Sequence, residues 1–132
     1  MAKLIHTMIR VRNLAPSLAF YHDAFGLEVA HRLDFPEFSL AYLRNAETEA
    51  ELELTWNRDR NQPYTHGDGY GHVALSVADA AATRRRFEEL GLSPREMREF
   101  RDQAGGLLAR YFFVEDPDGY KIEVLERHGH YT

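Results

Sequence analysis

Cysteine is absent from the 132-residue sequence. Its absence excludes a disulfide framework, a thiolate nucleophile and thiolate metal ligands, so any metal site has to be built from His, Asp and Glu. A long apolar run is also missing, because the N-terminal stretch MAKLIHTMIRV leads directly into an alternating strand pattern. This pattern predicts neither a signal peptide nor a membrane span, and we expect a cytoplasmic protein.

An excess of basic residues is missing as well. The sequence has 16 Lys and Arg against 21 Asp and Glu, which gives a formal net charge of −5. This charge disfavours a nucleic-acid-binding surface. The one basic run, Arg84 to Arg86, has helical spacing and is interpreted as a solvated helix face. We therefore expect neither nucleic acid nor a membrane as a partner.

The order of sequence patterns repeats within the chain. Shifted by 66 positions, HTMIRVRN (6–13) lies over HVALSVAD (72–79), so that His6 matches His72. Each segment reads as a strand whose last residue, an Asn or an Asp, is a typical N-cap for the alanine-rich amphipathic stretch that follows. Both predicted helices stop at a Gly-Leu pair.

The second part of each half is also alike. FSLAYLRN (38–45) and ELELTWN (51–57) predict two strands around a loop, and residues 109–126 predict two strands around an Asp-Pro-Asp-Gly turn. Each half is therefore a strand and a helix followed by further strands. Since a unit of about 60 residues is marginal alone, we expect the two halves to complete a common core.

Composition suits a single domain, since 44% of the residues are hydrophobic and 28% are charged. We expect one domain of two modules, joined by a linker rich in Asn, Asp, Gly and Pro and followed by a frayed tail. The expected bounds are about 1–57 and 70–127 for the modules, 58–69 for the linker and 128–132 for the tail.

Strand alternation places one His and one Glu of each half on a common face. His6 faces away from the apolar positions of its strand, and Glu53 faces away from the leucines of ELELTWN. His72 and Glu123 occupy the corresponding places in the second half, where Glu123 stands opposite its apolar neighbours in YKIEVLE. We expect this face to be the helix-free side of each sheet.

Two carboxylates that converge inside a curved sheet are costly unless they are protonated or paired. A divalent cation removes this cost, because two Glu balance its charge and two neutral imidazoles add ligands without charge. This donor set suits Ni²⁺, Zn²⁺, Co²⁺ or Fe²⁺. Four protein ligands leave positions open for water or substrate, which is typical of a catalytic metal site rather than a structural one.

Taken alone, each of these residues has a simpler explanation as a hydrogen-bonded surface histidine or an exposed edge-strand carboxylate. The conjunction of two His and two Glu at matching repeat positions favours the metal site. The remaining histidines have no such counterparts and are interpreted as solvated helix, loop or tail residues, namely His22, His31, His66, His128 and His130.

The segments LIHTMIRV, ELELTWN, YGHVALSV and FVEDPDGYKIEVLE resemble the four metal-ligand segments of bacterial glyoxalase I (lactoylglutathione lyase), a family of the vicinal oxygen chelate superfamily. The resemblance covers essentially the whole chain. It implies an α+β fold of two βαβββ modules, with curved mixed sheets that form a metal-binding cup. The metal ligands that it implies are His6, Glu53, His72 and Glu123.

The resemblance also implies a homodimer in which each metal site takes His6 and Glu53 from one subunit and His72 and Glu123 from the other. The Arg and Asn with which the family contacts glutathione match Arg10 and Asn57, and strand alternation places these two beside the first His and Glu. Glutathione is the implied cosubstrate. The chain lacks the insertions of zinc-preferring relatives, which favours nickel over zinc or cobalt.

The activity implied by the resemblance is the isomerisation of the methylglyoxal–glutathione hemithioacetal to S-lactoylglutathione. Glu123 would act as the general base at C1, and Glu53 or a bound water would assist the transfer to C2. Many bacterial relatives carry a substrate-holding Lys where this chain has Ala104, before a Gly-Gly pair. Arg101 and Arg110 are the candidates to replace its charge.

Two other functions stay open on the sequence. One is a different metal-dependent enzyme of the superfamily, an epimerase or a thiol transferase, although such relatives as a rule lack a Glu at the position of Glu53. The other is a non-catalytic dimer that sequesters a small molecule, which four metal ligands fit poorly.

Overall fold

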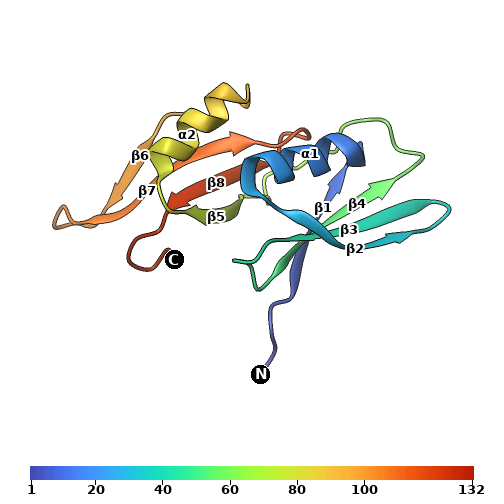
Figure 1. The fold of residues 1–132 in the computed structure, drawn as a ribbon, viewed down its shortest axis with the longest axis horizontal. Coiled ribbons are helices and arrows are strands. Elements are labelled where there is room, and N and C mark those ends of the chain that lie inside the picture. Colours follow the sequence, from blue (N-terminus) through green and yellow to red (C-terminus); the bar gives the residue numbers. More distant parts are fainter. The chain divides into compact units, whose positions relative to one another are not determined.

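The computed structural model describes residues 1–132 as two compact units, Met1–Thr65 and His66–Thr132. Each unit consists of one helix and one mixed sheet of four strands (Figure 1). This arrangement confirms the predicted α+β class with two βαβββ modules. Neither helix has the length and hydrophobicity that a membrane span requires.

The first unit has its strands in the order β1-β4-β3-β2. Strands β1 and β4 are parallel, and the other neighbours are antiparallel. The elements are β1 (His6–Val11), α1 (Leu14–Phe25), β2 (Glu28–Asp34), β3 (Phe38–Arg44) and β4 (Glu51–Asn57).

The second unit repeats this topology in the order β5-β8-β7-β6, again with its first two neighbours parallel. The internal repeat of the sequence is therefore a repeat of strand order and direction. The elements are β5 (Val73–Val77), α2 (Ala80–Glu89), β6 (Arg98–Arg101), β7 (Leu107–Glu115) and β8 (Lys121–Glu126).

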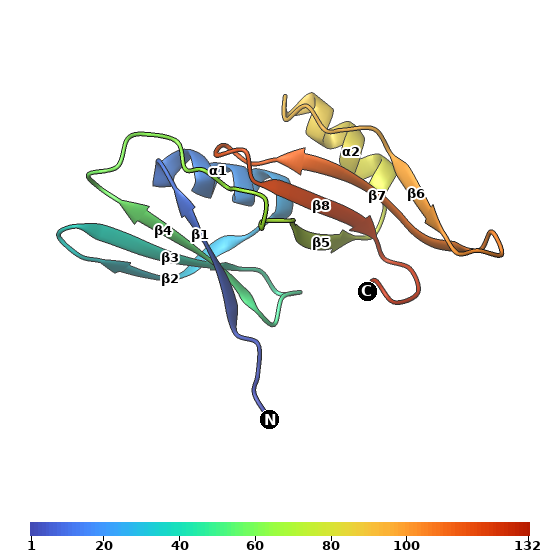
Figure 2. The ribbon, with the colours of Figure 1, turned by 180° about the vertical axis from the view of Figure 1, so that it is seen from behind.

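The buried side chains of the first unit follow the predicted alternation of apolar and polar residues along its strands. Ile9 and Val11 of β1 and Leu52 and Leu54 of β4 are at most 6% exposed. They point to the opposite face from His6, because successive side chains of a strand alternate. The two views in Figures 1 and 2 show a helix over one face only of each sheet, so the histidines lie on the helix-free face.

The core of the second unit joins α2 to its sheet through aromatic packing. Phe87 of α2 and Phe112 of β7 are fully buried, and their ring centroids are 5.6 Å apart. Ile122 and Val124 of β8 are also fully buried. Each such side chain contributes about 1.5–3 kcal/mol by leaving water. Glu123, between the last two, is thereby held on the opposite face.

The predicted stop of the first helix is confirmed at Gly26. This residue has a left-handed φ of 64°, and its N–H donates to the carbonyl of His22 at 2.8 Å. Glycine adopts this conformation without the steric cost that a Cβ atom brings. The second helix ends in the same region of its repeat, with Gly91 at φ 74°.

The segments outside the sheets make specific contacts. The guanidinium of Arg12 donates to the carbonyl of Asn61, with Nη2 at 2.9 Å. At the C-terminal end the backbones of His128 and Tyr131 form a bridge with two hydrogen bonds. The imidazole of His128 also lies 3.1 Å from the carbonyl of Leu107.

Candidate metal centre

The first His–Glu pair lies across the parallel strands β1 and β4. Nε2 of His6 is 3.4 Å from Oε1 of Glu53. The two side chains are 35% and 11% exposed. Glu53 forms an ion-pair contact with this histidine. A carboxylate buried in this way is costly, so its surroundings suit a cation.

The second pair has the same geometry in the second unit. His72 directly precedes β5, and Glu123 lies in β8, the parallel neighbour of β5. Nε2 of His72 is 3.4 Å from Oε1 of Glu123, with side chains 42% and 17% exposed. The structure therefore brings each predicted His to the Glu of its own half, with the second pair somewhat more open to solvent.

The observed N–O distance fits two ligands of one ion. Imidazole nitrogens and carboxylate oxygens bind Zn²⁺ at about 2.0–2.2 Å, so adjacent ligand atoms at octahedral to tetrahedral angles lie roughly 2.8–3.6 Å apart. No third His, Cys, Asp or Glu joins either pair in a cluster that could hold a metal. Each unit thus brings together two candidate donors.

The predicted substrate contacts lie on the strands that carry the first pair. Arg10 of β1 stands level with Thr55 of β4, so along β4 it falls between Glu53 and Asn57. The side-chain amide of Asn57 donates to the hydroxyl of Tyr64 at 3.2 Å. Both Arg10 and Asn57 therefore lie towards the C-terminal end of β4 from the buried carboxylate.

The two arginines considered as replacements for the missing Lys share one carboxylate. Nη2 of Arg101 is 2.6 Å from Oε2 of Glu99, and Nη2 of Arg110 is 3.2 Å from Oε1 of Glu99. The side-chain hydrogen bonds from Arg101 and then Arg110 hold the pKa of Glu99 below its usual value. Both arginines thus form ion pairs with Glu99. Ala104 lies in the turn between β6 and β7.

A pocket of about 380 Å³ opens beside the second pair. Its wall is largely aromatic and aliphatic, and it includes Tyr131 from the C-terminal tail. Such a wall, with a few polar groups at one side, is typical of small-molecule sites. Its lining residues are His72, Phe100, Ala109, Tyr111, Glu123, Leu125 and Tyr131.

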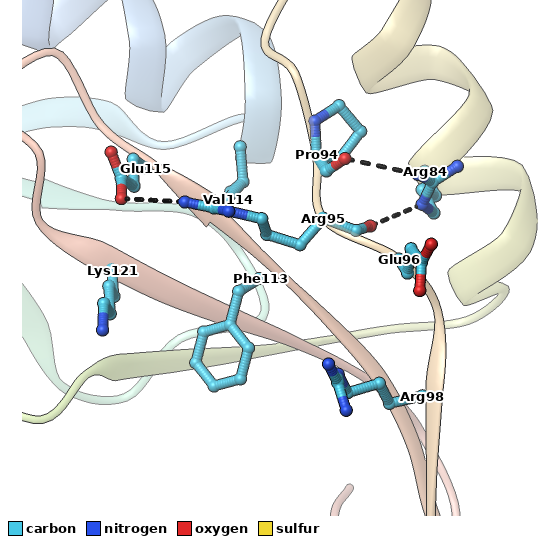
Figure 3. A pocket seen from close by; sticks show the side chains of 9 residues that line it. All are labelled: Arg84, Pro94, Arg95, Glu96, Arg98, Phe113, Val114, Glu115 and Lys121. Atoms are coloured by element: carbon cyan, nitrogen blue, oxygen red, sulfur yellow. Dashed lines mark hydrogen bonds and ion pairs between the residues drawn. The ribbon is translucent and has the colours of Figure 1, made fainter.

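A second pocket, of about 660 Å³, is shown in Figure 3. Arg84 donates to the carbonyls of Pro94 and Arg95, and Arg95 forms an ion pair with Glu115 at 3.6 Å. Phe113 belongs to its wall and also contacts His72, with ring centroids 5.4 Å apart. The ring of Phe113 is therefore shared, because it lines this pocket and also contacts the second His–Glu pair.

Sequence reasoning missed the aromatic residues that stand opposite the two glutamates. Tyr42 of β3 is level with Glu53, and Phe113 of β7 is level with Glu123. The ring of Tyr42 contacts the ring of His6 at 5.7 Å, as Phe113 does with His72. Strand alternation alone cannot find these neighbours, because it does not fix which residues of two strands stand opposite each other.

Comparison with known proteins gives the family. The model of the Glyoxalase/Bleomycin resistance protein/Dioxygenase superfamily matches residues 3–124. The chain belongs to this superfamily. The match spans both His–Glu pairs of the chain.

Relatives within the glyoxalase superfamily are similar over nearly the full length. The lactoylglutathione lyase of Haemophilus influenzae is 40% identical, over 94% of this chain and 92% of its own. That of Salmonella typhimurium is 42% identical, over 94% of this chain and 92% of its own. The structure of the trypanothione-dependent glyoxalase I of Leishmania major has a TM-score of 0.75 and 32% identity, covering 96% of this chain and 87% of that one.

Proposed function

We propose that the protein is a lactoylglutathione lyase, which isomerises the methylglyoxal–glutathione hemithioacetal to S-lactoylglutathione. The observation that carries the proposal is the matched pair of imidazole–carboxylate contacts, each at 3.4 Å, on the helix-free faces of two repeated modules. Full-length similarity to lactoylglutathione lyases at 40% to 42% identity supports the same activity.

The proposed metal ligands are His6, Glu53, His72 and Glu123, supplied by two subunits of a homodimer. One subunit gives the first pair and its partner gives the second. Each unit brings together only two of these donors, so neither pair alone is a complete site. We favour Ni²⁺ as the native ion over Zn²⁺ or Co²⁺, although the donor types accept all three.

In the proposed mechanism Glu123 is the general base. Its carboxylate takes the proton from C1 of the hemithioacetal and the proton is then delivered to C2, so the product forms without net oxidation. When bound, the metal ion supplies a Lewis acid that stabilises the negative charge developing on the substrate oxygens. Glu53 is the candidate to assist delivery to C2.

Arg10 and Asn57 are the proposed contacts of the thiol cosubstrate. The guanidinium of Arg10 would pair with a carboxylate of glutathione, a charge-assisted contact that suits its planar geometry. With Ala104 in the β6–β7 turn and Arg101 and Arg110 both engaged by Glu99, the second unit offers no free cation in the predicted places. The identity of the thiol is therefore tested separately.

The test is reconstitution of the metal-free protein. The apoprotein is loaded with Ni²⁺, Zn²⁺ or Co²⁺, and thioester formation is followed from methylglyoxal with glutathione, with trypanothione and without a thiol. We expect no turnover without metal and glutathione-dependent turnover with at least one ion. If the protein binds these ions and none gives turnover with either thiol, the proposed activity is wrong.

A further inference from the structure

The two halves of the proposed metal site differ in the aromatic residue opposite each glutamate, a tyrosine in the first half and a phenylalanine in the second. Tyr42 stands opposite Glu53 in the β3–β4 register, and Phe113 stands opposite Glu123 in the β7–β8 register. The rings meet the neighbouring histidines edge-on in both halves, at 5.7 Å and 71° for Tyr42 and at 5.4 Å and 75° for Phe113. The backbone and ring arrangement is thus common to both, and only Tyr42 carries a donor.

The hydroxyl of Tyr42 is engaged by the glutamate. The strand register places Tyr42 directly opposite Glu53, and a side-chain hydrogen bond joins the two. Glu53 thus has two side-chain partners, His6 and Tyr42. Glu123 has an imidazole on one side and an aromatic ring without a hydroxyl on the other.

Tyr42 is itself braced. Its ring lies between two histidines, with His6 at 5.7 Å and His31 at 5.9 Å between ring centroids. A donor held in this way can fix the orientation of the carboxylate that it contacts, as outer partners of metal ligands commonly do. The Glu53 side chain is also the more buried of the two glutamates, since it is 11% exposed and the Glu123 side chain is 17% exposed.

We propose that Tyr42 is a positioning residue that holds Glu53 in place as a fixed metal ligand, while Phe113 leaves Glu123 free to move between the metal and the substrate. The proposal rests on the proposed function and deepens it. The two carboxylates occupy equivalent positions, and the residue opposite each one determines whether it stays fixed or moves.

Exchange of the two aromatic residues tests the proposal. The variants are Tyr42→Phe and Phe113→Tyr, each of which changes one hydroxyl and serves as the matched control of the other. The readouts are metal affinity, from competition with a chelator, and kcat at saturating metal. Thermal unfolding of each variant establishes that it is folded.

We expect Tyr42→Phe to weaken metal affinity about tenfold, which is in the range found for outer-shell partners of ligands. We expect Phe113→Tyr to keep metal affinity and to lower kcat at saturating metal about tenfold, because the added hydroxyl would restrain Glu123. If Tyr42 only stabilised the fold, Tyr42→Phe would lower the unfolding temperature. The two variants would then not differ in which quantity falls, metal affinity for one and kcat for the other.

Two results would overturn the proposal. One is a folded Tyr42→Phe variant that binds metal as tightly as the wild type. The other is a Phe113→Tyr variant with unchanged kcat. If the wild type binds metal but lacks isomerase activity, the proposed function fails while the metal affinity of Tyr42→Phe still decides whether the tyrosine positions Glu53.

Discussion

At the scale of single residues, the central feature is a glutamate in the middle of a core strand. Glu123 lies between Ile122 and Val124, both fully buried on the other face of β8. Its carboxylate meets the imidazole of His72 at 3.4 Å instead of a basic side chain. A largely buried carboxylate with an imidazole neighbour and an adjoining pocket is well placed to exchange a proton with a substrate.

The first residue-scale prediction concerns Glu123→Gln. The amide keeps the size and one oxygen donor but cannot accept a proton as a base. We therefore expect isomerase activity to fall at least about 100-fold, which is the lower range for loss of a general base. Activity is measured as thioester formation, and retained metal is measured after gel filtration.

Glu89→Gln at the end of α2 is the matched control, because this exposed carboxylate lies outside both pairs. It should leave both measurements unchanged. A Glu123→Gln protein that binds metal normally and keeps full activity would show that another group is the base.

At the scale of elements, the two helices begin alike in sequence but differently in structure. Asp79 caps α2, since its Oδ1 accepts a hydrogen bond from the N–H of Ala82 at 2.9 Å. Glu126 adds a second acceptor for this helix end, from the N–H of Ala80 at 3.0 Å. Asn13, the N-cap of α1, makes no side-chain capping bond. The predicted helix starts are confirmed, but only one of the two caps forms the expected bond.

This difference predicts unequal costs of removing the two caps. Asp79→Ala should lower the free energy of unfolding by about 1 kcal/mol, the usual value of a side-chain cap. Asn13→Ala should cost less than about 0.5 kcal/mol, since no capping bond is lost. Urea denaturation followed by circular dichroism measures both. Equal losses for the two variants would contradict the observed hydrogen bonds.

At the scale of the whole molecule, the chain is two copies of one topology. Both sheets have the same strand order, and both carry a His at or just before the first strand and a Glu in its parallel neighbour. Parallel pairing explains why residues so distant in sequence meet. In each unit the chain passes through a helix and two further strands before it returns to the side of its first strand.

The proposed homodimer makes a whole-molecule prediction. His6→Ala and His72→Ala should each be inactive alone, since each removes one ligand from every site. A mixed dimer of the two would carry one intact site and one site without both histidines. Unfolding and refolding an equal mixture should therefore restore about one quarter of wild-type activity, because half of the dimers are mixed.

The alternative gives a different result. If each site were built within one chain, every site in the mixture would lack one histidine, and activity would stay at the level of the single variants. Absence of recovery in a mixture shown to contain mixed dimers would therefore reject the shared site.

The local sequence pattern determined which strand residues face the core and where the helices end. The alternation in HTMIRV and YKIEVLE determines which side chains face the core, because a strand has a period of two residues. The Gly-Leu pairs determine where the helices stop, because glycine accepts the left-handed conformation. The repeat of these signals was sufficient to predict two halves, each with a strand and a helix followed by further strands, and to group a His with a Glu in each half. The full βαβββ order came from the family resemblance.

Only the tertiary structure decided which residues stand across from one another. The register of β3 on β4 places Tyr42 opposite Glu53, and the register of β7 on β8 places Phe113 opposite Glu123. Arg101 and Arg110 were likewise indistinguishable in sequence until the fold brought both to Glu99. The physical reason is that alternation is a property of one strand, whereas register and ion pairing depend on contacts between segments far apart in the chain.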